Sequence, residues 1–507
     1  MPQYLSPGVY VEEVDSGSRP IEGVGTAVAG FVGLAPRGPA NQPTLITNWS
    51  QFTQAFGDFT DGSYLAQAVY GYFLNGGGSC YVVRIEGDGV SPTAQGELTS
   101  GAGDTKVGAY QIAALEPGAA GNDIAVDVEH VEGDDESFRL VVKKGGKVEE
   151  TFDGLTVKRG RQNAATVVNA QSKLIRLEAA TSGAAVERPA AASVGLAGGG
   201  SNSPARLSAD DYVGDPADRT GFAGLEAIDE VTMLAVPDLM AAYQKGMVDL
   251  DGVQAVQQAM IAHCELMGDR MAILDPPPGL NAQQVHDWRV EKTGYDSKYA
   301  TLYWPWVKVF DPGHGQNVFV PPSGYMAGIW SRNDNTRGVH KAPGNETVRG
   351  ALGLETQITK GEHDLLNPVG VNCIRAFPGR GIRVWGARTL SSDPAWRYVN
   401  IRRLFNYLEE SILDGTQWAV FEPNDRALWA RIRRSIEAFL VMEWRKGALF
   451  GLTPDEAFYV KCDDETNPAE GIDLGQVVCE IGVAPVKPAE FVVFRLSQYS
   501  GGASLVE

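Results

Sequence analysis

Strand-length apolar runs alternate with helical stretches through the middle of the chain, and this alternation restricts the possible folds more than any other feature. Val231–Val236 and Arg270–Leu274 are short apolar runs of strand length. Between them, apolar side chains recur on one helical face over Val253–Cys264. Tyr299–Phe310 is a further extended run. A strand–helix–strand order favours a mainly parallel sheet with helices on its faces.

The same alternation begins nearer the start of the chain and is then interrupted. Its expected elements are a strand in Thr26–Leu34, a helix over Tyr64–Leu74 and a strand over Cys80–Ile85. Residues 96–205 differ because they are rich in Gly, Ala, Thr and Val and contain period-two runs such as Ile124–Glu129. Lys144-Gly145-Gly146-Lys147 is typical of a hairpin turn. We therefore expect a β-rich domain inserted into the α/β unit.

The last quarter of the chain predicts a separate unit of helices and short strands. Apolar residues from Ile401 to Ile412 form one helical stripe, and a second helix is expected from Asn424. Thr453-Pro454-Asp455-Glu456 has the pattern of a helix capping box. Strand-like runs follow at Val477–Val483 and Glu490–Leu496.

Together these patterns predict a multidomain α/β and α+β protein. The expected parts are an N-terminal arm (1–22), an α/β core in two pieces (23–95 and 206–390), an inserted β-rich domain (96–205), a C-terminal α+β domain (391–487) and a C-terminal strand arm (488–507). A chain of 507 residues exceeds the roughly 250–300 residues at which a single core stops growing. Several domains are therefore expected on size alone.

The chain is acidic, with 43 Lys and Arg against 63 Asp and Glu. Nucleic-acid binding needs a basic surface that displaces counterions, so this balance argues against a nucleic-acid partner. No apolar run approaches the ~18 residues of a membrane span, so direct membrane insertion is not expected. Met1–Leu5 lacks the basic and apolar stretches of a secretory signal. Five irregularly spaced cysteines predict reduced, mostly buried thiols in a cytoplasmic protein.

Catalytic, cofactor and metal motifs are missing from the sequence. There is no Gly-x-Ser-x-Gly elbow, His-Glu-x-x-His pair or phosphate-binding Gly-x-x-x-x-Gly-Lys-[Ser/Thr] loop. None of the six histidines lies four residues from another, so no helical metal pair is possible. We therefore expect no catalytic residue, cofactor or metal, although an enzyme built on the α/β core stays open as an alternative.

The two ends of the chain carry strand-like segments, and an unpaired strand is an exposed edge. One reading is that both segments pair within their own subunit. The other is β-augmentation, in which a strand of one subunit completes a sheet in the next. If each subunit both gives and receives a strand, the contact does not close and a helical polymer follows. The candidate donor residues are Val9, Tyr10, Val11, Val14, Phe491, Val493, Phe494 and Leu496.

The helix expected from Asn424 is basic. Its arginines are Arg426, Arg431, Arg433 and Arg434. They form either a solvated helix face or a docking surface for an acidic partner.

Four stretches of the sequence match elements of one known family. They are Tyr4–Val14, Gly30-Phe31-Val32-Gly33, Glu116-Pro117-Gly118 and Gly381–Leu390 followed by Trp396–Arg403, of which the last is the most specific combination. With these residues, the chain resembles contractile tail sheath proteins along nearly its whole length, those of phage-tail-like extracellular injection systems and of contractile-tailed phages. Glu116-Pro117-Gly118 is similar to the start of that family's inserted domain.

This resemblance implies a non-enzymatic structural subunit that forms a helical homopolymer around an inner tube protein, on a baseplate and under a terminal cap. Contraction from an extended state would drive the tube through a target envelope. The two chain ends would be the strand donors, and the basic helix at Arg426–Arg434 would be a candidate contact with the inner tube. Assembly would take place in the bacterial cytoplasm, and the final particle would be cytoplasmic, extracellular or a virion tail. A static shell protein is the competing structural reading.

Overall fold

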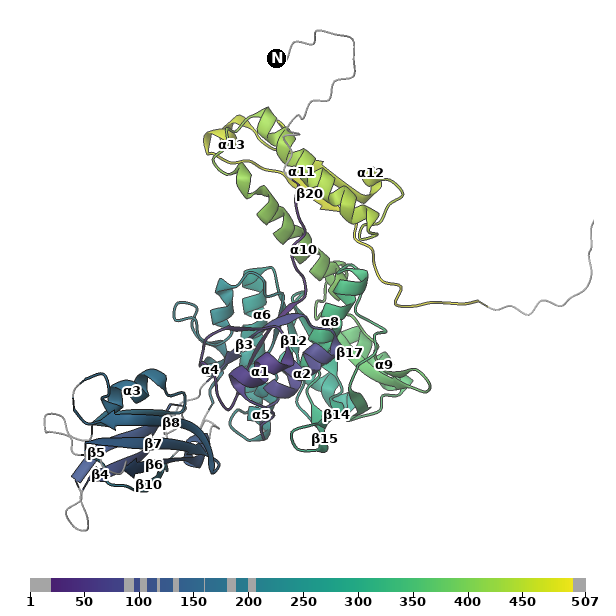
Figure 1. The fold of residues 1–507 in the computed structure, drawn as a ribbon. Coiled ribbons are helices and arrows are strands. Elements are labelled where there is room, and N and C mark those ends of the chain that lie inside the picture. The colour runs from purple at the N-terminus through teal and green to yellow at the C-terminus, as the bar shows by residue number, and fades with distance from the viewer. Residues whose placement is uncertain are drawn as a thin grey trace, which may run out of the picture.

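The structure is a computed structural model that describes most of the chain (Figure 1). The described residues are 20–85, 95–100, 107–115, 119–130, 136–158, 160–179, 188–198 and 207–495. The expected N-terminal donor strand at Val9–Val14 and the last C-terminal donor residue, Leu496, lie outside these ranges.

An eight-stranded sheet forms the centre of the molecule, and we call the part built around it the central domain. Its strands run in the order β18-β17-β13-β12-β11-β1-β3-β2. The six inner strands are parallel to one another, and β2 and β18 pair antiparallel at the edges. The bounds are β1 Val28–Gly33, β2 Thr44–Ile46, β3 Ser79–Arg84, β11 Met233–Ala235, β12 Met271–Leu274, β13 Ala300–Trp304, β17 Val371–Phe377 and β18 Gly381–Val384. This is the mainly parallel sheet that the strand–helix alternation predicted.

Helices cover both faces of this sheet, and each face has its own buried core. One core joins the sheet to α1, α2 and α8, and the other joins it to α5, α6 and α7. The bounds are α1 Trp49–Phe56, α2 Leu65–Asn75, α4 Ala209–Val213, α5 Asp238–Gln244, α6 Leu250–Met267, α7 Ala282–Asp287, α8 Ser323–Arg337 and α9 Lys360–Leu366. Helices α2 and α8 pack closely because a Cβ at Gly324 would lie 2.5 Å from Ala68 Cα. No helix among the described residues is both long and apolar enough to cross a bilayer.

A second, three-stranded sheet of order β15-β14-β16 lies beside the central one. Its strands are β14 Val307–Asp311, β15 Gln316–Val320 and β16 Ala351–Leu354. The extended run predicted over Tyr299–Phe310 therefore becomes two strands in two different sheets. The Trp304–Pro305 peptide bond between these two strands is cis.

The inserted β-rich segment folds around a core of its own. Its described residues contain a sheet of order β10-β6-β7-β8, a sheet of order β4-β5-β9 and the helix α3. Their bounds are β4 Gln95–Ser100, β5 Val107–Ala114, β6 Ile124–His130, β7 Ser137–Lys144, β8 Lys147–Thr156, α3 Ala164–Gln171, β9 Ile175–Ala179 and β10 Ser193–Gly195. Gly145 and Gly146, at φ 56° and 80°, form the expected two-residue hairpin turn between β7 and β8.

Residues 399–486 form a unit of helices and a small sheet, which we call the C-terminal domain (Figure 1). Helices α10 and α11 pack against a two-stranded sheet of β19 and β20. The bounds are α10 Val399–Thr416, α11 Arg426–Arg445, α12 Pro454–Ala457, β19 Phe458–Lys461, α13 Ala469–Asp473 and β20 Glu480–Val483. The expected strand at Glu490–Leu496 has no strand partner over its described residues, 490–495. Thr453 makes no side-chain cap hydrogen bond, so the predicted capping box is not formed.

Candidate assembly site

The segment before β1 runs from the central sheet along α10 to the C-terminal domain. Ile21 is buried there, and a Cβ on Gly415 would lie 2.6 Å from Ile21 Cγ1. The Val24 N–H donates to Ser411 Oγ at 3.1 Å. A Cβ at Gly23 would overlap the ring of Tyr407. The small residues on both sides therefore let this segment lie directly on the helix.

A buried ion pair joins this segment, α8 and α10. Arg403 on α10 donates to both carboxylate oxygens of Asp334 on α8, at 2.9 and 2.6 Å. Their side chains are only 4% and 3% exposed. The same guanidinium donates to Thr26 O at 2.7 Å and lies over the ring of Trp330, 4.8 Å from its centroid. Three separate parts of the chain are thus held at one charged contact.

Residues 487–495, which we call the C-terminal segment, run from the C-terminal domain back to the central domain. Glu490 fixes the segment there. Arg388 donates to both Glu490 oxygens, at 2.8 and 2.7 Å, and Asn367 and Tyr398 donate at 2.9 Å each. Burial acts to raise the pKa of Glu490, but the hydrogen bonds from Arg388, Asn367 and Tyr398 outweigh it. The pKa therefore lies below its usual value, and the carboxylate stays charged at neutral pH.

Beyond this anchor the chain carries four exposed apolar side chains in a row. Phe491, Val492, Val493 and Phe494 are 73%, 68%, 76% and 83% exposed. The segment leads away from both domains (Figure 1). Three of these residues are among the predicted C-terminal donor residues. Such consecutive exposed apolar residues are typical of a surface that another chain covers.

The small sheet of β19 and β20 has edges that other strands of the described residues leave open. It contains two strands among the described residues, so each strand has one side without a strand neighbour there. A two-stranded sheet is marginally stable unless it packs on other elements or gains strands, and here α11 covers one face. Tyr459 on β19 is 60% exposed on the other face.

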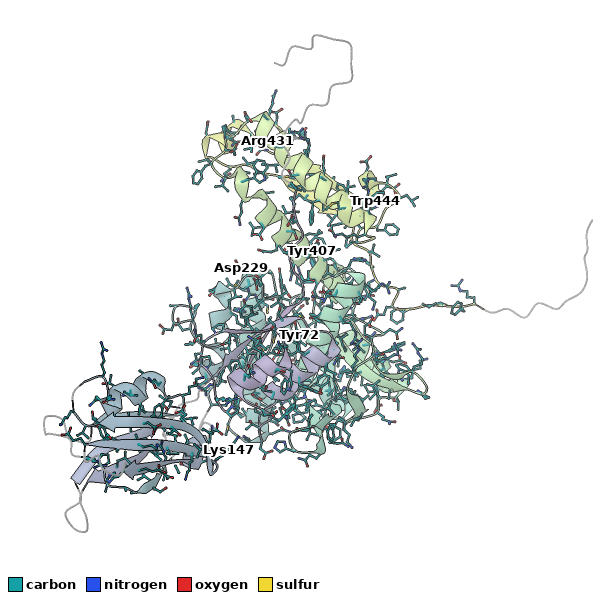
Figure 2. All side chains as sticks on the ribbon, in the orientation of Figure 1. Tyr72, Lys147, Asp229, Tyr407, Arg431 and Trp444 are labelled. Carbon is teal, nitrogen blue, oxygen red and sulfur yellow. The ribbon has the colours of Figure 1, made fainter. Side chains whose placement is uncertain are left out.

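Three of the four predicted arginines on α11 are paired with carboxylates within the chain. Arg426 lies 3.0 Å from Asp464, and Arg431 lies 2.9 Å from Glu422. Arg433 is 4.0 Å from Glu437. Arg434 donates to the Ala430 carbonyl. Arg431 lies toward the end of α11 that is farther from the central domain (Figure 2). The pairing lowers the positive charge that this helix presents, and the tube-contact role stays a prediction.

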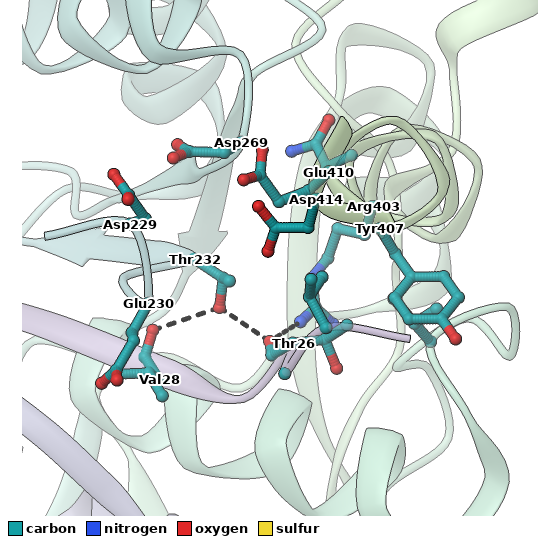
Figure 3. A pocket seen from close by; sticks show the side chains of 14 residues that line it. Thr26, Val28, Asp229, Glu230, Thr232, Asp269, Arg403, Tyr407, Glu410 and Asp414 are labelled. Carbon is teal, nitrogen blue, oxygen red and sulfur yellow. Dashed lines mark hydrogen bonds between the residues drawn. The ribbon is translucent and has the colours of Figure 1, made fainter. Parts of the chain in front are cut away.

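A cavity of about 390 Å³ opens between the central domain and α10 (Figure 3). Its wall is acidic, with Asp229 and Asp269 from the central domain facing Glu410 and Asp414 of α10. Burial of Glu410 raises the pKa of its carboxyl group, and the nearby negative charges of Asp269, Asp414 and Asp229 raise it further. No group of three or more His, Cys, Asp or Glu among the described residues is arranged to hold a metal ion. No sequence motif pointed to this cavity, because its carboxylates come from distant parts of the chain.

Two adjoining stretches of the chain match models of one protein family. Residues 226–390 match the phage tail sheath protein central domain, and residues 391–498 match the phage tail sheath C-terminal domain. The chain belongs to the phage tail sheath family. The second match begins at the junction where the sequence predicted a separate C-terminal unit.

Curated relatives of this sheath protein come from several phages. The tail sheath protein of Burkholderia phage BcepMu is 24% identical over 510 residues, covering 96% of this chain and 95% of the relative. That of Vibrio phage KVP40 is 26% identical over 73% of this chain and 56% of the relative. A putative prophage major tail sheath protein of Pseudomonas aeruginosa is 28% identical over 48% of this chain and 61% of the relative. The chain thus spans less than two thirds of the KVP40 and Pseudomonas proteins.

Solved structures share the fold of this sheath protein. The sheath of an extracellular contractile injection system, the PVC sheath complex in its contracted state, aligns over 99% of both chains with a TM-score of 0.58 and 22% identity. The contracted helical sheath of the anti-feeding prophage aligns over 97% of this chain and 99% of the other, with a TM-score of 0.60 and 24% identity. A sheath tail protein of Desulfitobacterium hafniense gives 0.61 at 12% identity, over 90% and 94% of the chains.

Proposed function

We propose that this chain is the structural subunit of a contractile sheath, which polymerises helically around an inner tube and drives that tube through a target envelope when it shortens. The observation that carries the proposal is the described C-terminal segment. Its four consecutive exposed apolar residues, from Phe491 to Phe494, follow an anchor at Glu490 and have no strand partner among the described residues.

Strand exchange between copies gives the exposed apolar residues of the C-terminal segment a role. An extended segment can add to the open side of a sheet in another copy, where main-chain hydrogen bonds supply affinity. Among the described residues, β19 and β20 each have one side without a strand neighbour, and a strand from another copy can pair there. Because the donor segment and the acceptor sheet are different surfaces, the contact is heterologous, and it builds an open helix where the rotation between neighbours does not close a ring.

Contraction in this proposal draws its energy from subunit contacts rather than from a bound nucleotide. An extended polymer that forms only part of its possible contacts is metastable, and shortening completes them. Repacking a fraction of a standard interface of roughly 1,600 Å², at ~25 cal/mol per Å² of apolar surface, supplies several kcal/mol per subunit. Linked strands keep neighbours together while the subunits rotate, which a static shell does not need.

The partners and location follow from the same proposal. The inner tube, the baseplate and a terminal cap are the expected partners, together with further copies of the chain itself. A solved relative of similar fold was determined within the baseplate of the anti-feeding prophage, which supports a place near a baseplate. Assembly takes place in the bacterial cytoplasm in this proposal. Polymerisation needs no catalytic activity, and we assign none to this chain. Helix α11 is the candidate face toward the tube.

Negative-stain electron microscopy of the purified chain tests this proposal. We expect hollow, striated tubes from the wild-type chain, and loss of tubes in Val493→Asp, because a charge in the donor strand prevents its burial. Val148→Asp is the matched control, since Val148 is 51% exposed on β8 of the inserted domain. Uniform small particles from the wild-type chain at every concentration, or normal tubes from Val493→Asp, would count against the proposal.

A further inference from the structure

Two of the five cysteines face each other across the small sheet of the C-terminal domain. The register of β19 and β20 pairs Phe458 with Val483 and Lys461 with Glu480. Continued by one residue beyond Lys461 and Glu480, this register places Cys462 directly opposite Cys479. Side chains of directly opposed residues in antiparallel strands point to the same face. The two sulfur atoms therefore share one side of the sheet, the side covered by α11.

The hydrogen-bond pattern shows which kind of pair the cysteines form. The Ala484 N–H donates to the Ala457 carbonyl at 2.8 Å, so these two residues form a hydrogen-bonded pair. Such pairs alternate with non-hydrogen-bonded pairs along an antiparallel ladder. Counting from Ala457, the position of Cys462 falls on a non-hydrogen-bonded pair, in which the Cα atoms are about 4.5 Å apart. That spacing lies within the 4.4–6.8 Å range of disulfides.

We propose that Cys462 and Cys479 are an oxidisable pair whose disulfide fastens the end of the β19–β20 ladder. The cysteines end the ladder at the point where the chain leaves it for the excursion that contains α13. Asn467 holds this excursion by exchanging hydrogen bonds with the Val478 backbone, at 3.0 and 2.7 Å. A disulfide would close the loop over residues 463–478 covalently and keep the two strands from separating there. Both cysteines belong to one chain, so the disulfide can form without assembly.

The different exposure of the two cysteines determines which thiol reacts first. Cys462 is 1% exposed, whereas Cys479 is partly exposed and is the thiol that an oxidant reaches. Burial raises the pKa of both thiols, to about 12 for Cys479, whereas Arg433 acts in the opposite direction. The thiols are therefore protonated at neutral pH, and oxidation is slow because only a small fraction is present as thiolate.

The oxidant in the proposed step is a small disulfide such as oxidised glutathione. Cys479 loses its proton, and its thiolate attacks one glutathione sulfur, which forms a mixed disulfide and releases one glutathione thiolate. Cys462 then loses its proton and attacks Cys479 Sγ, which forms the protein disulfide and releases the second glutathione thiolate. The protein loses two protons and two electrons, and the two electrons reduce one glutathione disulfide to two thiols.

Peptide mapping of the full chain tests the proposal. After prolonged incubation with oxidised glutathione, acid quenching and alkylation in denaturant, we expect one linked peptide pair that contains Cys462 and Cys479. Cys80, Cys264 and Cys373, which are buried in the central domain, should be alkylated instead. Alkylation of both Cys462 and Cys479, or linkage of either to another cysteine, would overturn the inference.

Thermal unfolding gives an independent readout. The melting temperature of the C-terminal domain should be about 10–20 °C higher in oxidised wild-type chain than in reduced chain, because the loop is closed in the unfolded state. Cys479→Ser should abolish this difference, and Cys264→Ser should keep it. An equal difference in Cys479→Ser would refute the assignment, and the peptide map of the wild-type chain decides the question if that variant does not fold.

Discussion

The buried contact between Arg403 and Asp334 leads to a prediction whose magnitude follows from the structure. Both side chains are at most 4% exposed, and both guanidinium–carboxylate hydrogen bonds are 2.9 Å or shorter. Arg403→Met leaves the Asp334 carboxylate buried without its counter-charge, although the Thr26 hydroxyl still donates to it. Breaking a buried pair in this way costs about 3–5 kcal/mol. Removing both charges, in Arg403→Met with Asp334→Leu, should recover most of that loss.

Urea unfolding followed by tryptophan fluorescence measures this effect, since Trp330 lies directly under the Arg403 guanidinium. Arg426→Met is the matched control. Its partner Asp464 is 66% exposed and Arg426 itself is 80% exposed, so its loss should cost less than about 1 kcal/mol. The reasoning is refuted if Arg403→Met is no more harmful than Arg426→Met, or if the double variant is as unstable as Arg403→Met alone.

Three further predictions concern titration and the C-terminal anchor. Burial raises the pKa of Asp275 to about 7, so the folded chain binds its proton more tightly than the unfolded chain, and this group's contribution to stability falls as pH rises from about 4 to about 7. Asp275→Asn should flatten that part of a plot of melting temperature against pH, and an unchanged slope would contradict the assignment. Glu410→Gln should raise stability by less than about 1 kcal/mol at a pH where the Glu410 carboxyl is ionised, because a repelling charge is removed, and it should leave stability unchanged in acid. The control Glu409→Gln, at an exposed residue that pairs with Arg402, should give no such gain. Arg388→Leu should release Glu490 and increase amide hydrogen exchange around it, and exchange as slow as in the wild-type chain would show that the anchor is not needed.

The parallel sheet could be predicted from sequence because its strands are buried on both faces and therefore read as continuous apolar runs. The same property hid the second sheet, because Tyr299–Phe310 is apolar apart from Thr301 and Lys308. Only Pro305 marks the point at which this run divides between two sheets. The partner strand β15 is short and largely exposed. Local pattern therefore identified strands, but not the sheet to which each belongs.

Side-chain partners were the less predictable part of the site. The capping-box pattern at Thr453 is present in the sequence, yet Glu456 accepts a hydrogen bond from the Leu452 N–H. The positive charge of Arg426 was evident, but its partner Asp464 is supplied by a distant loop. The anchor of Glu490 on Arg388 was missed for the same reason. Such contacts depend on the tertiary arrangement, which no local spacing encodes.

The position of the inserted β-rich segment has a consequence for how this protein can vary. The chain leaves the central domain after β3 and returns before α4, and Ile85 and Leu207, near its two ends, belong to the same buried core. The inserted segment has a separate core, so neither core needs side chains from the other. The site between Ile85 and Leu207 is therefore a natural attachment point, at which a different folded module could replace the present one while the central sheet keeps its strand order.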